Sequence, residues 1–317
     1  MNAAVDLVAQ DAPLLRLGRA LQGSGYRFTT VTPATHARVN ARAGNQWARS
    51  VEDVFGWSRP FRAEVLPAAW LDLMQAGDVL RTHGEGWRST IRASTLDGAL
   101  FLHSAHPTTA SDAVFFGPDT YRFAAAINSR LAAGGPVRRA VDIGCGAGPG
   151  AVVVALARPA AEVVGVDIND QALRYARLNA ALAGLSNVAV RRSDLLSAVE
   201  GEFDLIIANP PYLLDRDERA YRHGGGTLGE GLSLAIAGLA GTRLAPGGTL
   251  LLYTGTAVCG GVDGFCQRVA SRLQAAGLDW SYREIDPDVF GEELLEPAYA
   301  GADRIAAVLV TATRRAA

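Results

Sequence analysis

The alternation of short apolar runs with helical stretches, from about residue 137 onward, constrains the fold of this chain more than any other feature. The apolar runs lie at Ala140–Ile143, Val163–Val166, Val188–Val190, Leu205–Ala208, Thr249–Leu252 and Ala306–Val310. Helical patterns lie between several of them, at Ala151–Ala157, Gln171–Ala183, Leu232–Leu244 and Phe265–Ala276. Strands that alternate with helices of this length build βαβ units around a parallel sheet, which binds ligands at the carboxyl ends of its strands.

The first 112 residues have a different pattern, and we therefore predict two domains, residues 1–112 and 113–317. Short helices are expected at Leu14–Leu21 and at Ala68–Gln75. A β-hairpin is expected from Val79 to Ala93, around the turn Gly84-Glu85-Gly86. Helices followed by a hairpin are typical either of a winged-helix-like module or of a cap that packs on the next domain.

The charge balance of this first part favours the cap. It holds 11 arginines against 10 acidic residues, and the whole chain has a formal net charge of −2. Domains that read duplex DNA gather basic residues on one face, and this segment has no such cluster. We therefore expect a substrate-side cap and no duplex DNA partner.

Composition excludes several other classes of protein. Hydrophobic residues make up 49% of the chain, which suits a globular protein, and no apolar run reaches the roughly 18 residues of a membrane span. All 30 basic residues are arginine, so no Schiff-base or Walker lysine is present. The N-terminal segment, with Asp6 and Asp11, has no apolar leader. Cys145, Cys259 and Cys266 make no CxxC pair, which favours a reduced, cytoplasmic setting, and the five histidines lack metal-ligand spacing.

A glycine-rich loop follows the first strand of the sheet. It reads Asp142-Ile143-Gly144-Cys145-Gly146-Ala147-Gly148 and opens a helix. Glycines at such a turn allow the backbone to approach a ligand closely. The spacing is G-x-G-x-G, because Pro149 stands where a dinucleotide fingerprint has its last glycine, and no phosphate-loop Gly-Lys follows.

Carboxylates end the second and third strands. Asp167 follows Val163–Val166, where an acid can accept hydrogen bonds from both ribose hydroxyls of an adenosine group. Asp194 follows the third strand, where a carboxylate can accept a hydrogen bond from an adenine amino group. Each has a structural alternative, since Asp167 can cap the following helix and Asp194 can cap a loop.

The segment Asn209-Pro210-Pro211-Tyr212, which closes the fourth strand, carries the sharpest functional signal. Two prolines fix the backbone and remove two N–H donors, and Asn209 adds a side-chain acceptor. Together they predict a pocket rich in acceptors for a planar NH₂ group, with Tyr212 offering an aromatic face.

With these four motifs in this order, the chain resembles class I S-adenosylmethionine (SAM)-dependent methyltransferases. It is most similar to the Asn-Pro-Pro-Tyr amino-methyltransferases, which include release-factor glutamine, small-domain ribosomal RNA and adenine-N6 DNA enzymes. The helical segment Ala172–Ala180 and the glycine-rich segment Gly224–Leu232 add to the resemblance. Phe116–Tyr121 resembles the entry loop that reaches over SAM in the same relatives. It covers about residues 113–317.

The resemblance implies a Rossmann-like, doubly wound, mainly parallel seven-stranded sheet in a three-layer α/β/α domain, with SAM as cofactor and no metal. It implies that Asn209, Pro210 and Tyr212 hold the acceptor amine. The implied SAM contacts are Tyr121, Asp142, Gly144, Cys145, Gly146, Gly148, Asp167, Ile168, Asp194, Leu195 and Asn209.

Acceptors on Asn209 and Pro210 would favour pyramidalisation of the nitrogen and stabilise the charge that develops on it. The acceptor itself stays open among a protein, an RNA and a small molecule, and so does the oligomeric state. Two other readings stay open as well. One is a small-molecule biosynthetic enzyme that N-methylates a metabolite or cyclises SAM and releases methylthioadenosine, and the other is a non-catalytic SAM-binding protein.

Overall fold

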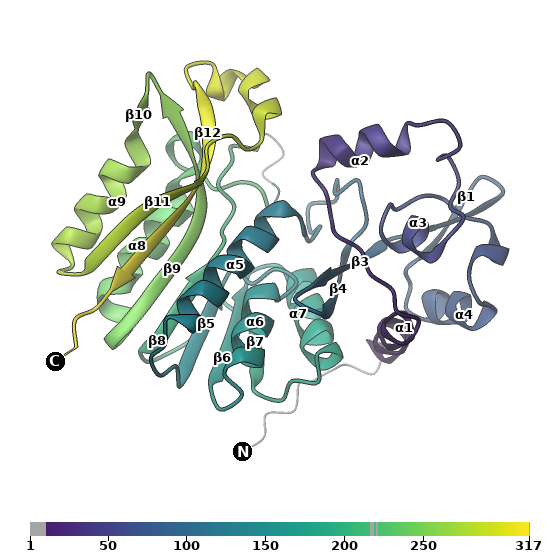
Figure 1. The fold of residues 1–317 in the computed structure, drawn as a ribbon, viewed down its shortest axis with the longest axis horizontal. Coiled ribbons are helices and arrows are strands. Elements are labelled where there is room, and N and C mark those ends of the chain that lie inside the picture. The colour runs from purple at the N-terminus through teal and green to yellow at the C-terminus, as the bar shows by residue number, and fades with distance from the viewer. Residues whose placement is uncertain (1–10, 216–218, 220, 317) are drawn as a thin grey trace.

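The computed structural model describes residues 11–215, 219 and 221–316. A twisted sheet with helices on both faces forms the larger part of the molecule, and the N-terminal elements lie at one side of it (Figure 1). The mixed α/β architecture with a central, mostly parallel sheet agrees with the sequence-based expectation. No helix in the described part of the chain is long and apolar enough to cross a membrane.

The sheet has the strand order β11-β12-β9-β8-β5-β6-β7. Strands β7, β6, β5, β8 and β9 are parallel to one another. Strand β12 pairs antiparallel with β9, and β11 pairs antiparallel with β12 at the edge of the sheet. A two-residue strand, β10, pairs with β9 outside this order. The bounds are β5 Arg139–Ile143, β6 Glu162–Asp167, β7 Val188–Arg192, β8 Phe203–Ala208, β9 Leu244–Cys259, β10 Val262–Asp263, β11 Asp279–Asp286 and β12 Arg304–Thr313.

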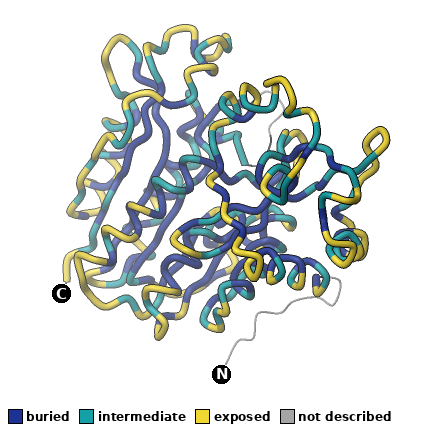
Figure 2. The backbone as a smooth tube through the Cα atoms, turned by 45° about the vertical axis from the view of Figure 1, so that its right-hand side comes forward, coloured by how far each residue is buried: buried dark blue, intermediate teal, exposed yellow. Residues whose placement is uncertain are grey.

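Helices cover both faces of the sheet and bury its apolar side chains. Helices α5 (Pro118–Ala132), α6 (Pro149–Ala157) and α7 (Asp170–Leu182) lie on one face. Helices α8 (Gly231–Arg243) and α9 (Gly264–Ala275) lie on the other (Figure 1). Alternate residues of the strands enter two different cores, since Ala140 of β5 packs on the α5–α6 side and Val141 on the α8–α9 side. Figure 2 shows the strands buried between helices whose outer faces are exposed.

The N-terminal cap, residues 11–112, combines short helices with two β-hairpins. The helices are α1 Ala12–Gly23, α2 Pro33–Asn40, α3 Val51–Phe55 and α4 Ala68–Ala76, with a 3₁₀ turn at Ala63–Val65. The hairpins are β1 Leu80–His83 with β2 Gly86–Ser89, and β3 Ile91–Leu96 with β4 Ala99–Ser104. The predicted domain boundary after residue 112 falls in the segment that joins β4 to α5.

The structure corrects two details of the sequence analysis in this half. The hairpin expected around Gly84-Glu85-Gly86 is present as β1–β2, but its second strand is Gly86–Ser89 and not Ile91–Ala93. Ile91–Leu96 instead forms a second hairpin with β4. Its turn, Asp97-Gly98, has positive φ at both residues, 51° and 83°. Asp-Gly is a strong sequence signal for such a two-residue turn. The segment Phe116–Tyr121, expected as a loop, already enters helix α5, which begins at Pro118 after an extended Gly117.

One asparagine of the sheet domain fastens the cap. Asn179 of α7 is fully buried, and its amide satisfies both backbone groups of Leu102 in β4, at 2.8 and 2.9 Å. The same side chain donates to the carbonyl of Ala147 in the glycine loop at 2.8 Å. Leu178 and Tyr175 of α7 share a hydrophobic core with the cap. The cap is thus bonded directly to the helix that follows β6 and to the loop that follows β5.

We expect Asn179→Ala to lower the free energy of unfolding by about 2–4 kcal/mol, because it leaves buried backbone groups of Leu102 and Ala147 without partners. Urea denaturation followed by circular dichroism measures this. The control is Asn128→Ala, whose exposed amide bonds only Asp97 at 2.7 Å, and we expect a change within about 0.5 kcal/mol. Equal effects of the two substitutions would contradict the role given to Asn179.

Candidate functional site

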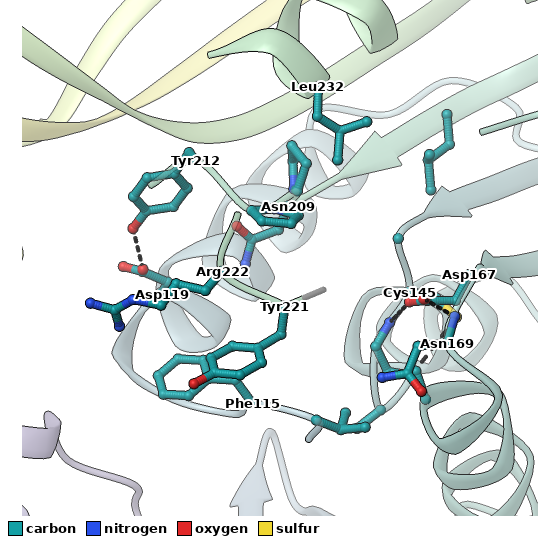
Figure 3. Close-up of a pocket in the computed structure, with 18 of the residues that line it drawn as sticks. Phe115, Asp119, Cys145, Asp167, Asn169, Asn209, Tyr212, Tyr221, Arg222 and Leu232 are labelled. Atoms are coloured by element: carbon teal, nitrogen blue, oxygen red, sulfur yellow. Dashed lines mark hydrogen bonds between the residues drawn. The ribbon is translucent and has the colours of Figure 1, made fainter. Parts of the chain in front are cut away.

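A cavity of about 220 Å³ lies at the carboxyl ends of β5, β6 and β8. Strand β5 is the switch point of the sheet, because the chain leaves it toward β6 on one side and returns to β8 on the other. Loops from adjacent parallel strands separate there and leave a crevice. Figure 3 shows Asp167 and Cys145 on one side of this cavity, and Asn209 and Tyr212 on another.

The cavity brings together most residues expected from the sequence. Its lining includes Asp142, Gly144, Cys145, Gly146, Asp167, Ile168, Asp194, Leu195, Asn209, Pro210 and Tyr212. Tyr121 and Gly148 are not among the described residues that line it. Gly148 instead meets helix α7, since a Cβ there would lie 3.1 Å from the Cα of Ala176. It therefore contributes to helix packing.

Tyr121 lies away from the cavity because of its place on α5. Asp119 and Phe123, four residues apart, share the helix face that lines the cavity. Tyr121 is on another face, where its hydroxyl accepts a hydrogen bond from the backbone N–H of Thr30 at 2.9 Å. Its ring meets Phe116 edge-on, with 5.6 Å between centroids. In this structure Tyr121 joins helix α5 of the sheet domain to the cap.

The glycine loop presents backbone to the cavity. Gly144, Gly146 and Gly148 all have positive φ, at 68°, 53° and 81°, which side chains rarely adopt. The N–H groups of Gly144 and Cys145 both donate to the Val166 carbonyl at 2.9 Å, and this fixes the loop against β6. A Cβ on Gly144 would meet no protein atom within 4 Å, so the space in front of it is open.

Asp167 is held in place by the backbone around it. Oδ2 accepts from the N–H of Gly146 and Oδ1 from that of Asn169, both at 2.9 Å (Figure 3). Burial raises the pKa of Asp167, and these N–H donors oppose the rise. The N–H of Ile168 also interacts with this carboxylate, and its remaining acceptor capacity is available to a ligand in the cavity.

Asp142 supports the loop from below. It is 2% exposed, and its Oδ2 accepts from the N–H of Ala151 in α6 at 2.9 Å. Burial raises the pKa of Asp142 to about 7, and the neighbouring Asp167 adds to the rise. Near neutral pH a substantial part of this carboxyl group is therefore protonated.

The end of the third strand contributes Asp194 and Leu195. Asp194 is exposed, and its backbone carbonyl accepts from the N–H of Ser197 at 3.0 Å. Leu195 has φ of 49°, a left-handed conformation that costs about 1 kcal/mol for a side chain of this size. Strained backbone of this kind is frequent at ligand-binding sites, and Leu195 lines the cavity.

The segment Asn209–Tyr212 divides into a free part and a bound part. Asn209 is half-buried, and its side chain makes no hydrogen bond with another described residue. Tyr212 is 7% exposed, and its hydroxyl donates to Asp119 of α5. The other oxygen of Asp119 accepts from Tyr253 of β9 at 2.8 Å. Asn209 therefore keeps its amide for a ligand, whereas Tyr212 fixes the segment to α5.

Several lining residues were missed by the sequence analysis. Phe115 and Tyr221 stack with 5.9 Å between centroids and 14° between planes (Figure 3). The Tyr221 hydroxyl donates to the carbonyl of Thr108 at 2.8 Å, which holds the long loop after β8 against the cap. Arg222 pairs with Glu293 and lies 3.4 Å from Asp215. The long loop after β8 includes residues 216–218 and 220, which lie outside the described residues. No local pattern marks these contacts, because they join distant segments.

Comparison with known proteins assigns the domain around this cavity. Residues 123–254 match the family described as the methyltransferase small domain. This similarity agrees with the SAM-dependent class I type that the motifs of the chain indicate.

Curated relatives match the same part. The release factor glutamine methyltransferase of Deinococcus radiodurans is 34% identical over 165 residues, which cover 49% of this chain and 55% of that protein. That of Cereibacter sphaeroides is 36% identical over 176 residues, 51% and 60% of the two chains. A 4-amino-L-phenylalanine/4-methylamino-L-phenylalanine methyltransferase of Streptomyces pristinaespiralis is 37% identical over 123 residues, 35% and 42%. The chain thus spans about half the length of these relatives.

Among solved structures, a T. thermophilus 16S rRNA N2 G1207 methyltransferase in complex with AdoMet and guanosine has a TM-score of 0.48. Its identity is 18%, over 81% of this chain and 64% of the other. A ribosomal protein L11 methylase from Lactobacillus delbrueckii has a TM-score of 0.43 and 20% identity, over 64% and 82%. In the described part of the chain, no group of three or more His, Cys, Asp or Glu side chains is placed to hold a metal ion.

The raised pKa of Asp142 makes stability depend on pH. The folded form keeps its proton up to about pH 7, while the unfolded form loses it near pH 4. The stability that this group contributes is therefore full in acid and declines as the pH rises through 7. We expect Asp142→Asn, which is neutral at all pH values, to gain on the order of 2–4 kcal/mol relative to the parent between pH 4.5 and 8.

Urea denaturation at several pH values checks this. Asp279→Asn is the control, because Asp279 is exposed and Arg315 lowers its pKa. Its stability relative to the parent should not rise with pH. If the curves of the parent and Asp142→Asn run parallel from pH 4.5 to 8, the assignment to Asp142 is wrong.

Proposed function

We propose that this chain is a SAM-dependent N-methyltransferase whose acceptor nitrogen binds at Asn209 and Pro210. The observation that carries the proposal is the unpaired amide of Asn209, which lies in the same cavity as Asp167 and the glycine loop (Figure 3). A cofactor side and an acceptor side thus share one space. Holding two reactants in this way is the main catalytic requirement of a methyl transfer.

The residues on the cofactor side suit an adenosine group with a positively charged tail. Asp167 offers a carboxylate at the wall of the cavity, which can accept hydrogen bonds from the hydroxyls of a ribose. Gly144 leaves open space where a side chain would stand. Asp194 is exposed on the third strand and is available to an adenine amino group. When bound, SAM supplies an electrophilic methyl group on a sulfonium sulfur.

The residues on the acceptor side suit a nitrogen whose lone pair is delocalised. Asn209 Oδ1 and the Pro210 carbonyl are acceptors, and Pro210 has no N–H that would compete. Bound to the N–H hydrogens, they orient the nitrogen toward the cofactor side. They also stabilise the positive charge that grows on it as the new bond forms. Tyr212, bonded to Asp119, is a positioning residue for this segment and holds it against α5.

The names of the relatives suggest two acceptors to test. One is a bacterial release factor, whose glutamine side chain carries an amide nitrogen. The other is 4-amino-L-phenylalanine, which carries an aromatic amine. Both nitrogens have the delocalised lone pair for which the acceptor side is suited. The names of the relatives do not favour SAM cyclisation or a non-catalytic role.

The test incubates the full chain with SAM and each acceptor and identifies the products by mass spectrometry. S-adenosylhomocysteine together with a methylated acceptor is the expected result. Methylthioadenosine without methyl transfer would overturn the proposal in favour of cyclisation. Binding of SAM without any turnover on either acceptor, or on a fractionated lysate, would indicate a binding protein.

We expect Asp167→Ala to weaken SAM binding by about 1.5–3 kcal/mol, the scale of lost hydrogen bonds to a charged group. Isothermal titration calorimetry measures it. Asp170→Ala is the matched control, since Asp170 is three residues away, 81% exposed and paired with Arg192, and its affinity should equal that of the parent. Unchanged affinity in Asp167→Ala would remove this residue from the cofactor site.

We expect Asn209→Ala to lower turnover by about 10²–10³-fold, because it removes an acceptor that gains strength only as charge builds on the nitrogen. SAM affinity should change much less, since the cofactor contacts lie on other residues. Asn209→Asp, which keeps an acceptor, should retain more activity than Asn209→Ala. A turnover of Asn209→Ala within about threefold of the parent would contradict the catalytic role, because it corresponds to a loss of less than about 0.7 kcal/mol in transition-state stabilisation.

A further inference from the structure

A second, smaller cavity lies beside the main one, inside the cap. Its volume is about 10 Å³, which is close to the space of one water molecule or one oxygen atom. Pro33, Thr108 and Phe115 line both cavities, so the two cavities are neighbours that share these residues. Its other polar lining residues are Arg92 of β3, His36 of α2, His103 and Ser104 of β4, and His106 after β4. None of these residues has a role in the proposed methyl transfer.

Arg92 is a buried cation without a carboxylate partner among the described residues. It is 5% exposed, and its Nε donates to the carbonyl of Gly56 at 2.9 Å. Its Nη2 is fully buried and has no hydrogen-bond partner in the described part of the chain. A buried charge with an unsatisfied N–H group is costly unless something binds to it, and few native proteins leave one without a reason.

The histidines around Arg92 add donors but no balancing charge. His36 is 2% exposed, and its Nε2 is buried and has no hydrogen-bond partner among the residues that the structure describes. Its ring lies against that of His106, with 4.0 Å between centroids. Burial and the positive charge of Arg92 lower the pKa of both rings, that of His36 to about 3. The cluster therefore has the single positive charge of Arg92 and neutral imidazoles that can donate through a ring N–H.

We propose that Arg92 and His36 form a subsite for the carboxylate group of the methyl acceptor. A carboxylate supplies the missing negative charge, and one of its oxygens can accept hydrogen bonds from the two unsatisfied groups, Arg92 Nη2 and His36 Nε2. The small volume suits one carboxylate oxygen and is too small for a phosphate group. The rest of the acceptor then extends past Phe115 into the main cavity toward Asn209. This inference rests on the proposed function and narrows its acceptor to an amine or amide that also carries a carboxylate.

The test is histidine-selective NMR on the full chain, titrated with sodium formate at constant ionic strength. His36 and His106 should show saturable shifts, while His83 and His223, which lie outside the small cavity, serve as internal references. Inorganic phosphate is the second arm and should give no saturable shift. A bound water alone predicts no response to formate, and that result would overturn the proposal. A phosphate response that saturates below the formate concentration would overturn the choice of a carboxylate.

Substitutions of Arg92 separate a binding role from a structural one. Arg92→Met should abolish the formate response and leave the melting temperature equal to or above that of the parent, because it removes an uncompensated buried charge. Arg92→Lys keeps the charge but loses the fork of donors, and we expect roughly tenfold weaker formate binding. Arg81→Met, at an exposed position of β1 paired with Asp78, is the control and should retain the full response.

A merely structural Arg92 gives a different result. In that case the melting temperature of Arg92→Met is lower than that of the parent. Formate then shifts the histidine signals of Arg92→Lys and of Arg81→Met equally. Formate binding requires neither SAM nor turnover, so the two proposals fail separately. Methyl transfer without a formate response at His36 overturns the carboxylate subsite and leaves the methyltransferase intact. A formate response without methyl transfer to any acceptor overturns the methyltransferase proposal and leaves the carboxylate-binding site intact.

Discussion

The structure depends on one constraint, the divergence of the chain on either side of β5. Strands β6 and β8 pair with opposite edges of β5 and run parallel to it, so the loops that follow these three strands must separate at the same end of the sheet. The glycine loop, Asp167 and Asn209 each lie directly after one of these strands. Their meeting in one cavity is therefore a result of topology, although they are up to 65 positions apart in the chain.

Sequence patterns predicted what depends on local periodicity. The parallel strands, their helices and the order of the motifs follow from apolar runs and glycine positions, which report backbone geometry and burial within a few residues. Strand β11 was missed because its residues Asp279–Asp286 are polar and partly exposed at the edge of the sheet. The start of α5 was missed because the segment was compared with a loop, although Pro118 at the first helical position indicates a helix.

The rest of the site could not be predicted, because it depends on contacts between distant segments. The stacking of Phe115 on Tyr221 joins the end of the cap linker to the loop after β8, and nothing in either segment encodes the other. The same holds for Arg92, which reads as an ordinary residue of a short strand and becomes unusual only when burial and the absence of an acidic neighbour are known. Burial of a charge is a property of the packed molecule.

The bond between Tyr212 and Asp119 has a consequence for how such proteins diversify. Asp119 lies in the first turn of α5, directly after the linker from the cap, yet it holds the acceptor segment of the sheet domain. An exchange of caps between related enzymes that cuts the chain after Asp119 would remove this support together with the old cap. A cut before Phe115 avoids this loss, because the sheet domain then keeps its own α5 whichever cap is joined to it.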